Sequence, residues 1–239
     1  MAISLRSHTS YGSGNNETSS TITAPSGIQN DDILLLWVNS SSGTNQTITP
    51  PSGFTLIDRT DDGTAEATAS YWKRASSESG NYTVTVGTSA EQSMVMAAYS
   101  GCTTLSTPVD VHNAQVNASG TSCTAPSVTT TLDNDQLVFF GANYRGGITT
   151  WTAPSGEVRQ EQINGVDNGN VCFCDEALGA AGATGDKVAT QNNANRNVGQ
   201  LVALSPAPVT PPLMKAVTVG GLAMQSLPVG IGQGGITVK

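Results

Sequence analysis

Short apolar runs, separated by polar and glycine-rich stretches, recur along the chain. In the first half they lie at 32–38, 53–58, 67–74, 81–86 and 93–100, and in the second half at 136–142, 157–163, 170–176, 186–191 and 199–205. Each run has the length of a strand and is bounded by turn-forming residues. No window holds apolar residues at the i, i+3, i+4, i+7 spacing of a helix for three turns. The pattern predicts an all-β fold, a jelly-roll-like β-sandwich.

The two sets of runs follow the same order about 100 residues apart. Asp32, before "ILLLWV", corresponds to Asp135, before "QLVFFGA", at an offset of 103 residues. Further pairs are Thr23 with Thr124 (101), Pro51 with Pro154 (103), Ala75 with Ala177 (102) and Ser100 with Ser205 (105). We therefore interpret residues 1–206 as two pseudo-repeats, about 1–105 and 106–206.

A repeated turn motif supports the duplication. "TAPSG" at 23–27 recurs as "TPPSG" at 49–53, "TAPS" at 124–127 and "TAPSG" at 152–156. Proline fixes φ near −65°, and glycine permits the positive φ of a chain reversal. The strands "ILLLWV" and "LVFF" are apolar on both faces, so both faces need cover. We expect the two halves to face each other and to bury both strands in a single core.

The amino-acid composition of the sequence changes after Pro206. Residues 207–213 are rich in proline, and residues 214–239 combine six glycines with alternating apolar residues. A segment of this kind is too glycine-rich to fold alone and too apolar to remain solvated. We expect 207–239 to be an extended segment for anchoring or oligomerisation, for example by adding a strand to another subunit. The candidate anchor residues are Leu213, Val217, Val219, Leu222, Leu227, Ile231, Ile236 and Val238.

Composition narrows the classes of function. Charged residues make up only 12% of the chain and the net charge is −8, so the basic patch that nucleic-acid binding needs is not expected. No segment has the roughly 18 consecutive apolar residues of a membrane span. The N-terminal residues have no apolar signal-peptide region, so we expect synthesis and folding in the cytoplasm of the producing cell.

The four cysteines suggest structural roles. Cys172 and Cys174 lie on one face of a predicted strand. Their Cα atoms are expected about 6.5 Å apart, which places the two residues poorly for a disulfide with each other. Cys102 and Cys123 flank the junction between the halves and are the pair that could form a disulfide, which a cytoplasmic product disfavours. The four cysteines lack the Cys-x-x-Cys spacing and the nearby histidine of a zinc site.

Candidate catalytic groups do not form a motif. We assign His8 to an unstructured N-terminus and His112 to the linker between the halves, and neither belongs to a recognisable triad. Carboxylates available for glycoside hydrolysis are Asp58, Asp61, Asp62, Glu157, Glu161, Asp175 and Glu176. Asp31, Asp32, Asp133, Asn134 and Asp135 offer oxygen ligands for calcium, without EF-hand spacing. We interpret all these acids as turn and surface residues, and expect no enzyme activity, cofactor or metal.

Aromatic residues suggest one recognition surface. Most lie within predicted strands and are expected in the core. Tyr144 and Trp151 flank the loop "RGGITT". We take Tyr144, Arg145 and Trp151 as the candidate surface-recognition residues.

The ordered motifs resemble a known group of proteins. "TAPSGIQNDDILLLWV", "PPSGFTLIDR", "YWKRASSESGNYTVTV" and "MAAYSG", with their counterparts in the second half, resemble a family of tailed-phage and prophage virion proteins. The resemblance covers residues 1–206 and implies a structural protein of the virion that decorates the capsid or the tail. It implies other virion proteins as partners. Separately, the glycine-rich residues 214–239 favour a homo-oligomer, because such segments often intertwine. The alternative is a tail-fibre module that binds a receptor or a glycan of the host surface.

Overall fold

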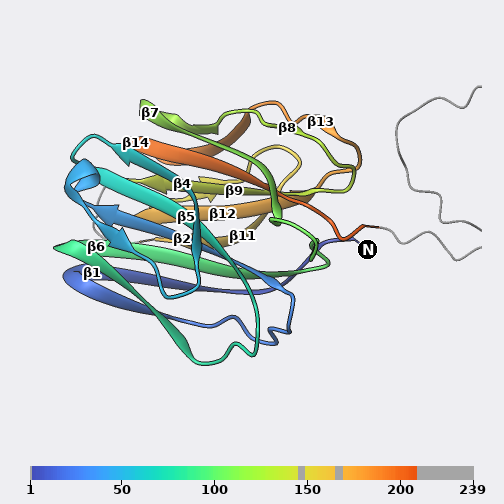
Figure 1. Cartoon of the computed structure of the whole chain (residues 1–239). Helices are drawn as coiled ribbons and strands as arrows, with labels where there is room; N and C mark the ends of the chain where they lie inside the picture. Colours follow the sequence, from blue (N-terminus) through green and yellow to red (C-terminus); the bar gives the residue numbers. More distant parts are fainter. Residues whose placement is uncertain (1, 145–148, 165–168, 209–239) are drawn as a thin grey trace, which may run out of the picture. The chain divides into compact units, whose positions relative to one another are not determined.

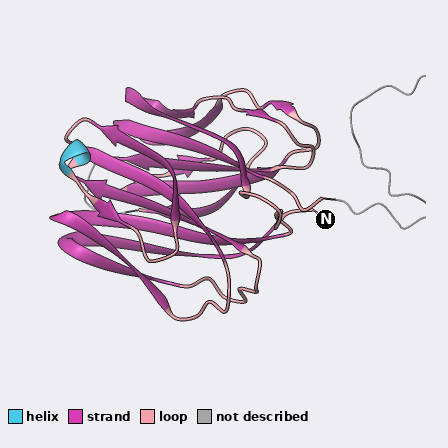
Figure 2. Ribbon diagram, in the orientation of Figure 1, coloured by secondary structure: helices cyan, strands magenta, loops and turns pink. Residues whose placement is uncertain are grey.

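The structure is a computed structural model that describes residues 2–144, 149–164 and 169–208. Strands make up most of these residues, and their only helix is the short 3₁₀ turn η1, Gly43–Asn45 (Figure 2). The strands of the first half are β1 (Ser4–Thr23), β2 (Ile33–Ser41), β3 (Ile48–Thr49), β4 (Thr55–Asp62), β5 (Glu66–Arg74) and β6 (Asn81–Ser100). Those of the second half are β7 (Val109–Ala125), β8 (Thr129–Thr130), β9 (Gln136–Asn143), β10 (Trp151–Thr152), β11 (Val158–Ile163), β12 (Asn170–Ala177), β13 (Gly182–Ala183) and β14 (Lys187–Leu204). The all-β sandwich is confirmed.

Each half of the chain builds one antiparallel sheet, and the two sheets have the same strand order. The first runs β1-β6-β2-β5-β4, with β3 paired to β6 (Figure 1). The second runs β7-β14-β9-β12-β11, with β7 and β10 both paired to β14. β8 and β13 form a separate two-stranded sheet in the second half. The strands β1 to β6 therefore correspond in order to β7, β9, β10, β11, β12 and β14.

Strand register makes the correspondence exact to the residue. Ile33 opens β2 between Tyr99 and Arg74, whereas Gln136 opens β9 between Leu204 and Ala177. Positions on β2 and β5 thus correspond to positions 103 residues later, and positions near the end of β6 to positions 105 residues later. Trp37 and Phe140 are equivalent by this register.

The described residues form three hydrophobic cores, not the single one expected from the sequence. Ile33, Leu35 and Trp37 lie in the core shared by the two sheets, together with residues of β9 and β12. Leu34 and Leu36 point to the opposite face of β2, into a core formed by the first half alone. The second half has its own outer core on β9, β12 and β14. Side chains alternate across a strand, so a strand that is apolar on both faces contributes to two cores.

The outer face of the first sheet is covered by its own two longest strands. β1 and β6 are each 20 residues long and pair along most of their length (Figure 1). Tyr82 and Val84, early in β6, pack in the same outer core as Met94 and Met96, late in β6. Register shifts lie between these two parts, around Glu17 of β1. The strand pair therefore bends, and its first part covers the sheet that its second part belongs to.

The long strands correct two expectations. Residues 4–23 form β1, so His8 is not in an unstructured N-terminus, and residues 109–125 form β7, so His112 is not in a linker. The runs 81–86 and 93–100 are parts of one strand, as are 186–191 and 199–205. Serine, threonine and asparagine fill β1 and β7, and an edge strand with one polar face needs few apolar residues.

The compact unit ends at Pro208, and Val209–Lys239 form a second unit. The end of the first unit is held in place, because Cys102 and Pro206 form an isolated β-bridge and Ala207 N donates to Gly101 O at 2.8 Å. The eight candidate anchor residues, Leu213 to Val238, lie outside the described residues. Within the described part of the chain, no helix has the length and apolar character to cross a membrane.

Candidate functional site

A groove opens at the seam between the two halves. It lies between β4 and β7, the neighbouring edge strands of the two sheets, and encloses about 470 Å³. Its lining residues are Thr55, Leu56, Ile57, Trp72, Thr107, Val109, Asp110 and His112. We refer to these residues as the seam groove. It combines an apolar wall with polar groups, as ligand sites commonly do.

Local irregularities in both edge strands shape the seam groove. A register shift between Leu56 and Asp58 on β4 inserts Ile57 as an extra residue. A second shift on β7 inserts Asp110 between Val109 and Val111. Bulges of this kind re-aim side chains at sheet edges. They leave Leu56 with 53% of its surface exposed.

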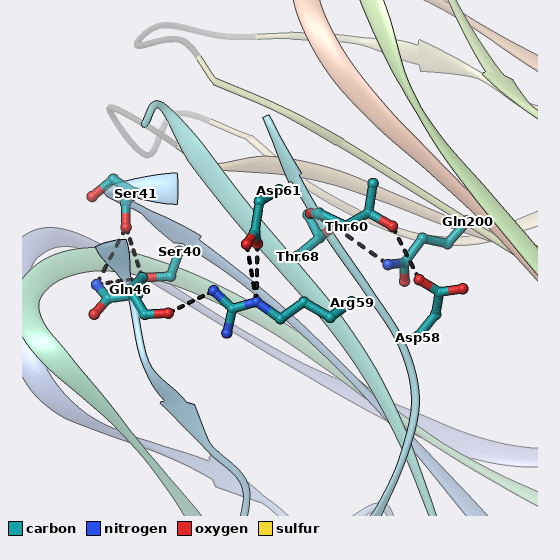
Figure 3. A network of polar contacts seen from close by, with 9 residues as sticks. All are labelled: Ser40, Ser41, Gln46, Asp58, Arg59, Thr60, Asp61, Thr68 and Gln200. Atoms are coloured by element: carbon teal, nitrogen blue, oxygen red, sulfur yellow. Dashed lines mark hydrogen bonds and ion pairs between the residues drawn. The ribbon is translucent and has the colours of Figure 1, made fainter. Parts of the chain in front are cut away.

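One histidine–aspartate contact crosses the seam beside the groove. His112 Nδ1 lies 2.9 Å from Asp58 Oδ2, so β7 of the second half contacts β4 of the first. Thr60 Oγ1 donates to the other oxygen of Asp58 at 3.1 Å (Figure 3). His112 is exposed, and a polar contact in such a position contributes at most about 1 kcal/mol. It orients two polar groups at the groove more than it stabilises the fold.

A polar network behind β4 holds this strand in position. Thr68 Oγ1 donates to Thr60 O at 2.8 Å, and Gln200 of β14 donates to Thr68 Oγ1 at 3.3 Å (Figure 3). Arg59 bonds Asp61 and donates to Gln46 O at 2.5 Å. Gln200 belongs to the second half and Thr68 to the first. The network therefore fixes the relative position of the two halves next to the seam groove.

The seam groove combines an apolar surface with hydrogen-bonding groups. Among the described residues, no Ser, Thr or Cys side chain is hydrogen-bonded to His112. Among the same residues, no group of three or more His, Cys, Asp and Glu side chains is placed to hold a metal ion. Trp72, Leu56 and Ile57 offer an apolar surface, and Asp110 and His112 offer hydrogen-bonding groups at its border.

Most carboxylates that were candidates for glycoside hydrolysis have structural partners. Asp58 contacts His112, Asp61 contacts Arg59, Asp62 contacts Arg196, Glu161 contacts Ser10, Asp175 accepts from Tyr99, and Glu176 contacts Lys187. Glu157 is buried, and neither of its oxygens has a hydrogen-bond partner among the described residues. Burial, with the neighbouring Glu176 and Asp175 adding to it and Lys187 opposing it, raises the pKa of Glu157 to about 8.

The residues expected to form a recognition surface do not do so together. Tyr144 is 39% exposed, and Arg145 lies outside the described residues. Trp151 is only 2% exposed, so its assignment to the surface is wrong. β10 pairs with β14, and this places the indole in the outer core of the second half.

The cysteines are structural. All four are free and buried. Cys102 lies in the shared core and Cys123 in the outer core of the second half, so they do not form a disulfide. Cys172 Sγ and Cys174 Sγ lie 3.4 Å apart on one face of β12. Burial raises the pKa of the Cys102 thiol to about 12, which makes it a poor nucleophile.

The seam groove is not evident from the sequence because its parts come from both halves. Trp72 was expected in the core and does pack against the shared core, but it is only half-buried and also lines the groove. His112 was assigned to the linker between the halves. One signal was available: "VDVHNAQV" places Val109 and Val111 two residues apart, the alternation of a strand.

The structure defines the class of protein as an all-β sandwich made of two equivalent halves with a groove at their seam. Comparison of the chain with family models, with characterised proteins and with solved structures finds no match. The resemblance to phage virion proteins therefore stays a prediction.

Proposed function

We propose that the protein is a non-enzymatic structural component of a bacteriophage virion. In this proposal the sandwich is displayed on the capsid or the tail, and the segment 207–239 attaches it to other virion proteins. The protein is made in the host cytoplasm and assembles as a homo-oligomer. The observation that carries the proposal is that the compact unit ends at Pro208, before the proline- and glycine-rich sequence of residues 209–239.

The chemistry of the sandwich supports a structural role. Its thiols are buried, its one histidine–carboxylate pair at the groove has no nucleophile among the described residues, and most of its carboxylates hold structural contacts. Uncharged Ser, Thr and Asn residues dominate the exposed strands β1 and β7. A surface of this kind remains hydrated without a strong field that would attract nucleic acid.

The proposal is tested by truncation after Pro208. We expect the truncated protein to fold and to be missing from purified particles, whereas the full chain sediments with them. A matched control replaces 209–239 with a Gly/Ser segment of the same length, which separates the need for these residues from the need for chain length. Normal incorporation of the truncated protein would refute attachment through this segment.

The seam groove favours one second candidate, a module that recognises a glycan of the host surface. A half-buried tryptophan beside hydrogen-bonding side chains suits a sugar ring, which offers an apolar face and peripheral hydroxyls. Trp72→Ala should abolish binding on a glycan array, whereas Tyr144→Ala, outside the groove, should preserve it. If Tyr144→Ala abolishes binding and Trp72→Ala does not, the recognition surface lies at the loop after β9 instead.

A further inference from the structure

Two equivalent positions in the halves carry side chains of opposite charge. Arg6 is the extra residue of β1, between Leu5, which pairs with Tyr99, and Ser7, which pairs with Ala98. Asp110 is the extra residue of β7, between Val109, which pairs with Leu204, and Val111, which pairs with Ala203. Tyr99 and Leu204 are equivalent, as are Ala98 and Ala203. Arg6 and Asp110 therefore occupy the same place in the two halves.

The residue that faces this place is an aspartate in both halves. Asp32 precedes β2, and Asp135 precedes β9. The main chain around them is the same, because Asp32 O accepts from Ala75 N and Asp135 O from Leu178 N, both at 2.8 Å. The two halves thus differ in the partner of the aspartate and not in its backbone setting.

In the first half the aspartate is fully satisfied. Arg6 Nε donates to Asp32 Oδ2 at 2.6 Å, and Arg6 Nη2 donates to Oδ1 at 2.9 Å. Gln29 N adds a third bond to Oδ2 at 2.8 Å. Asp32 is only 3% exposed, so the guanidinium supplies the positive charge that a buried carboxylate requires.

In the second half the equivalent aspartate has no donor. Asp135 is 0% exposed, and neither of its oxygens accepts a hydrogen bond from a described residue. Burial, reinforced by the adjacent carboxyl of Asp110, raises its pKa to about 7. Asp110 itself accepts from Thr131 N at 2.6 Å and from Thr131 Oγ1 at 2.5 Å. At this place the second half therefore has two neighbouring carboxyl groups, whereas the first half has a carboxylate paired with the guanidinium of Arg6.

We propose that Asp110 and Asp135 bind a hard divalent cation, Ca²⁺, in the place that the Arg6 guanidinium takes in the first half. The carboxyl groups of Asp110 and Asp135 offer oxygens, the ligands that Ca²⁺ prefers. The oxygens of Asp110 keep a free lone pair beside their bonds to Thr131. Asp110 also lines the seam groove, which gives the ion a route from solvent. Two carboxylates are few for Ca²⁺, so water and main-chain oxygens complete the shell, and the Kd falls at about 10⁻⁴–10⁻³ M.

The test is thermal unfolding of the full chain at pH 7.5 after removal of metal with a chelator. The protein is compared in 10 mM CaCl₂ and in NaCl of equal ionic strength, and calcium binding is measured in parallel by calorimetry. We expect Ca²⁺ to raise the Tm by about 3–6 °C if the Kd is near 1 mM. Asp135→Asn and Asp110→Asn should abolish both the shift and the calorimetric signal. Asp31→Asn removes the same charge at an exposed position and should keep both.

A rebuilding variant makes the test sharper. Asp110→Arg restores the pairing of the first half, so its Tm without calcium should exceed that of the wild type and should not respond to Ca²⁺. The proposal is overturned if calcium leaves the wild-type Tm unchanged, or if Asp135→Asn and Asp110→Asn respond as the wild type does.

Discussion

Trp37 and Phe140 stack on each other across the shared core, with ring centroids 5.6 Å apart and ring planes 9° apart. The two residues are equivalent, one from the central part of each sheet, and both are 0% exposed. Phe173 joins them, with its centroid 5.5 Å from that of Trp37. The contact between the halves is therefore centred on an aromatic cluster to which each half contributes.

Phe140→Ala should lower the free energy of unfolding by about 3–5 kcal/mol, because it removes a buried ring and leaves a cavity between the sheets. Chemical denaturation followed by tryptophan fluorescence measures this loss. Phe54→Ala is the matched control, since Phe54 is only partly buried at the border of the outer core, and it should cost less. A loss below about 1 kcal/mol for Phe140→Ala would show that the halves do not depend on the cluster.

Arg6→Met should destabilise the fold by about 1–3 kcal/mol, because Asp32 is left buried without its cation. The value is below that of a fully buried pair because 27% of the Arg6 side chain is exposed. Adding Asp32→Asn to Arg6→Met should recover part of the loss, since the amide carries no charge. The comparison uses urea unfolding at pH 7, and additive effects of the two substitutions would contradict the pairing.

Stability should fall as the pH rises from about 4.5 to 8, owing to Glu66. Burial, with Asp62 nearby, raises the pKa of Glu66 to about 8, so the folded protein holds a proton that the unfolded chain releases near pH 4.5. The contribution is complete below the unfolded pKa and is lost through the folded one. Glu66→Gln should reduce the slope of the unfolding free energy against pH between 5 and 8, and the slope that remains is due to Glu157 and Asp135, whose pKa values burial also raises. Asp61→Asn, at the same hairpin, is the control, and an unchanged slope in Glu66→Gln would refute the assignment.

The four cysteines should resist labelling in the native state. They are buried and free, so a thiol reagent at pH 8 should modify them slowly in buffer and all four rapidly in denaturant. Mass spectrometry counts the labels. Fewer than four labels in denaturant without reductant would reveal a disulfide, and rapid labelling of the native protein would contradict their burial.

The sequence predicts the central strands and the turns well, because their signals are local. "ILLLWV" and "LVFF" become β2 and β9, and the Pro-Ser-Gly turns place Gly53 and Gly156 at φ values of 86° and 91°. The edge strands β1 and β7 contain no comparable run of apolar residues. Their backbone groups are hydrogen-bonded by β6 and β14, and a partner strand far along the chain cannot be recognised from the local sequence.

The seam groove was beyond sequence analysis for a different reason. It depends on extra residues in β4 and β7, namely Ile57 and Asp110, and on the packing of one half against the other. A bulge has no dependable signature in a single sequence, and a contact such as His112 with Asp58 spans 54 residues. The spacing of apolar residues nevertheless predicts an all-β fold, and the only helix of the described residues is the 3₁₀ turn η1.

Because the two halves that share a core belong to one chain, each equivalent site can be substituted independently of the other. In a symmetric pair of identical subunits every substitution appears at both equivalent sites, so exchanging Arg6 for an acid would remove both bridges at once. Covalent linkage of the halves lets one site change while the other keeps its stabilising pair. The two sites are in such different states, because Arg6 and Asp32 form a bidentate ion pair in the first half whereas Asp110 and Asp135 place two carboxyl groups together in the second.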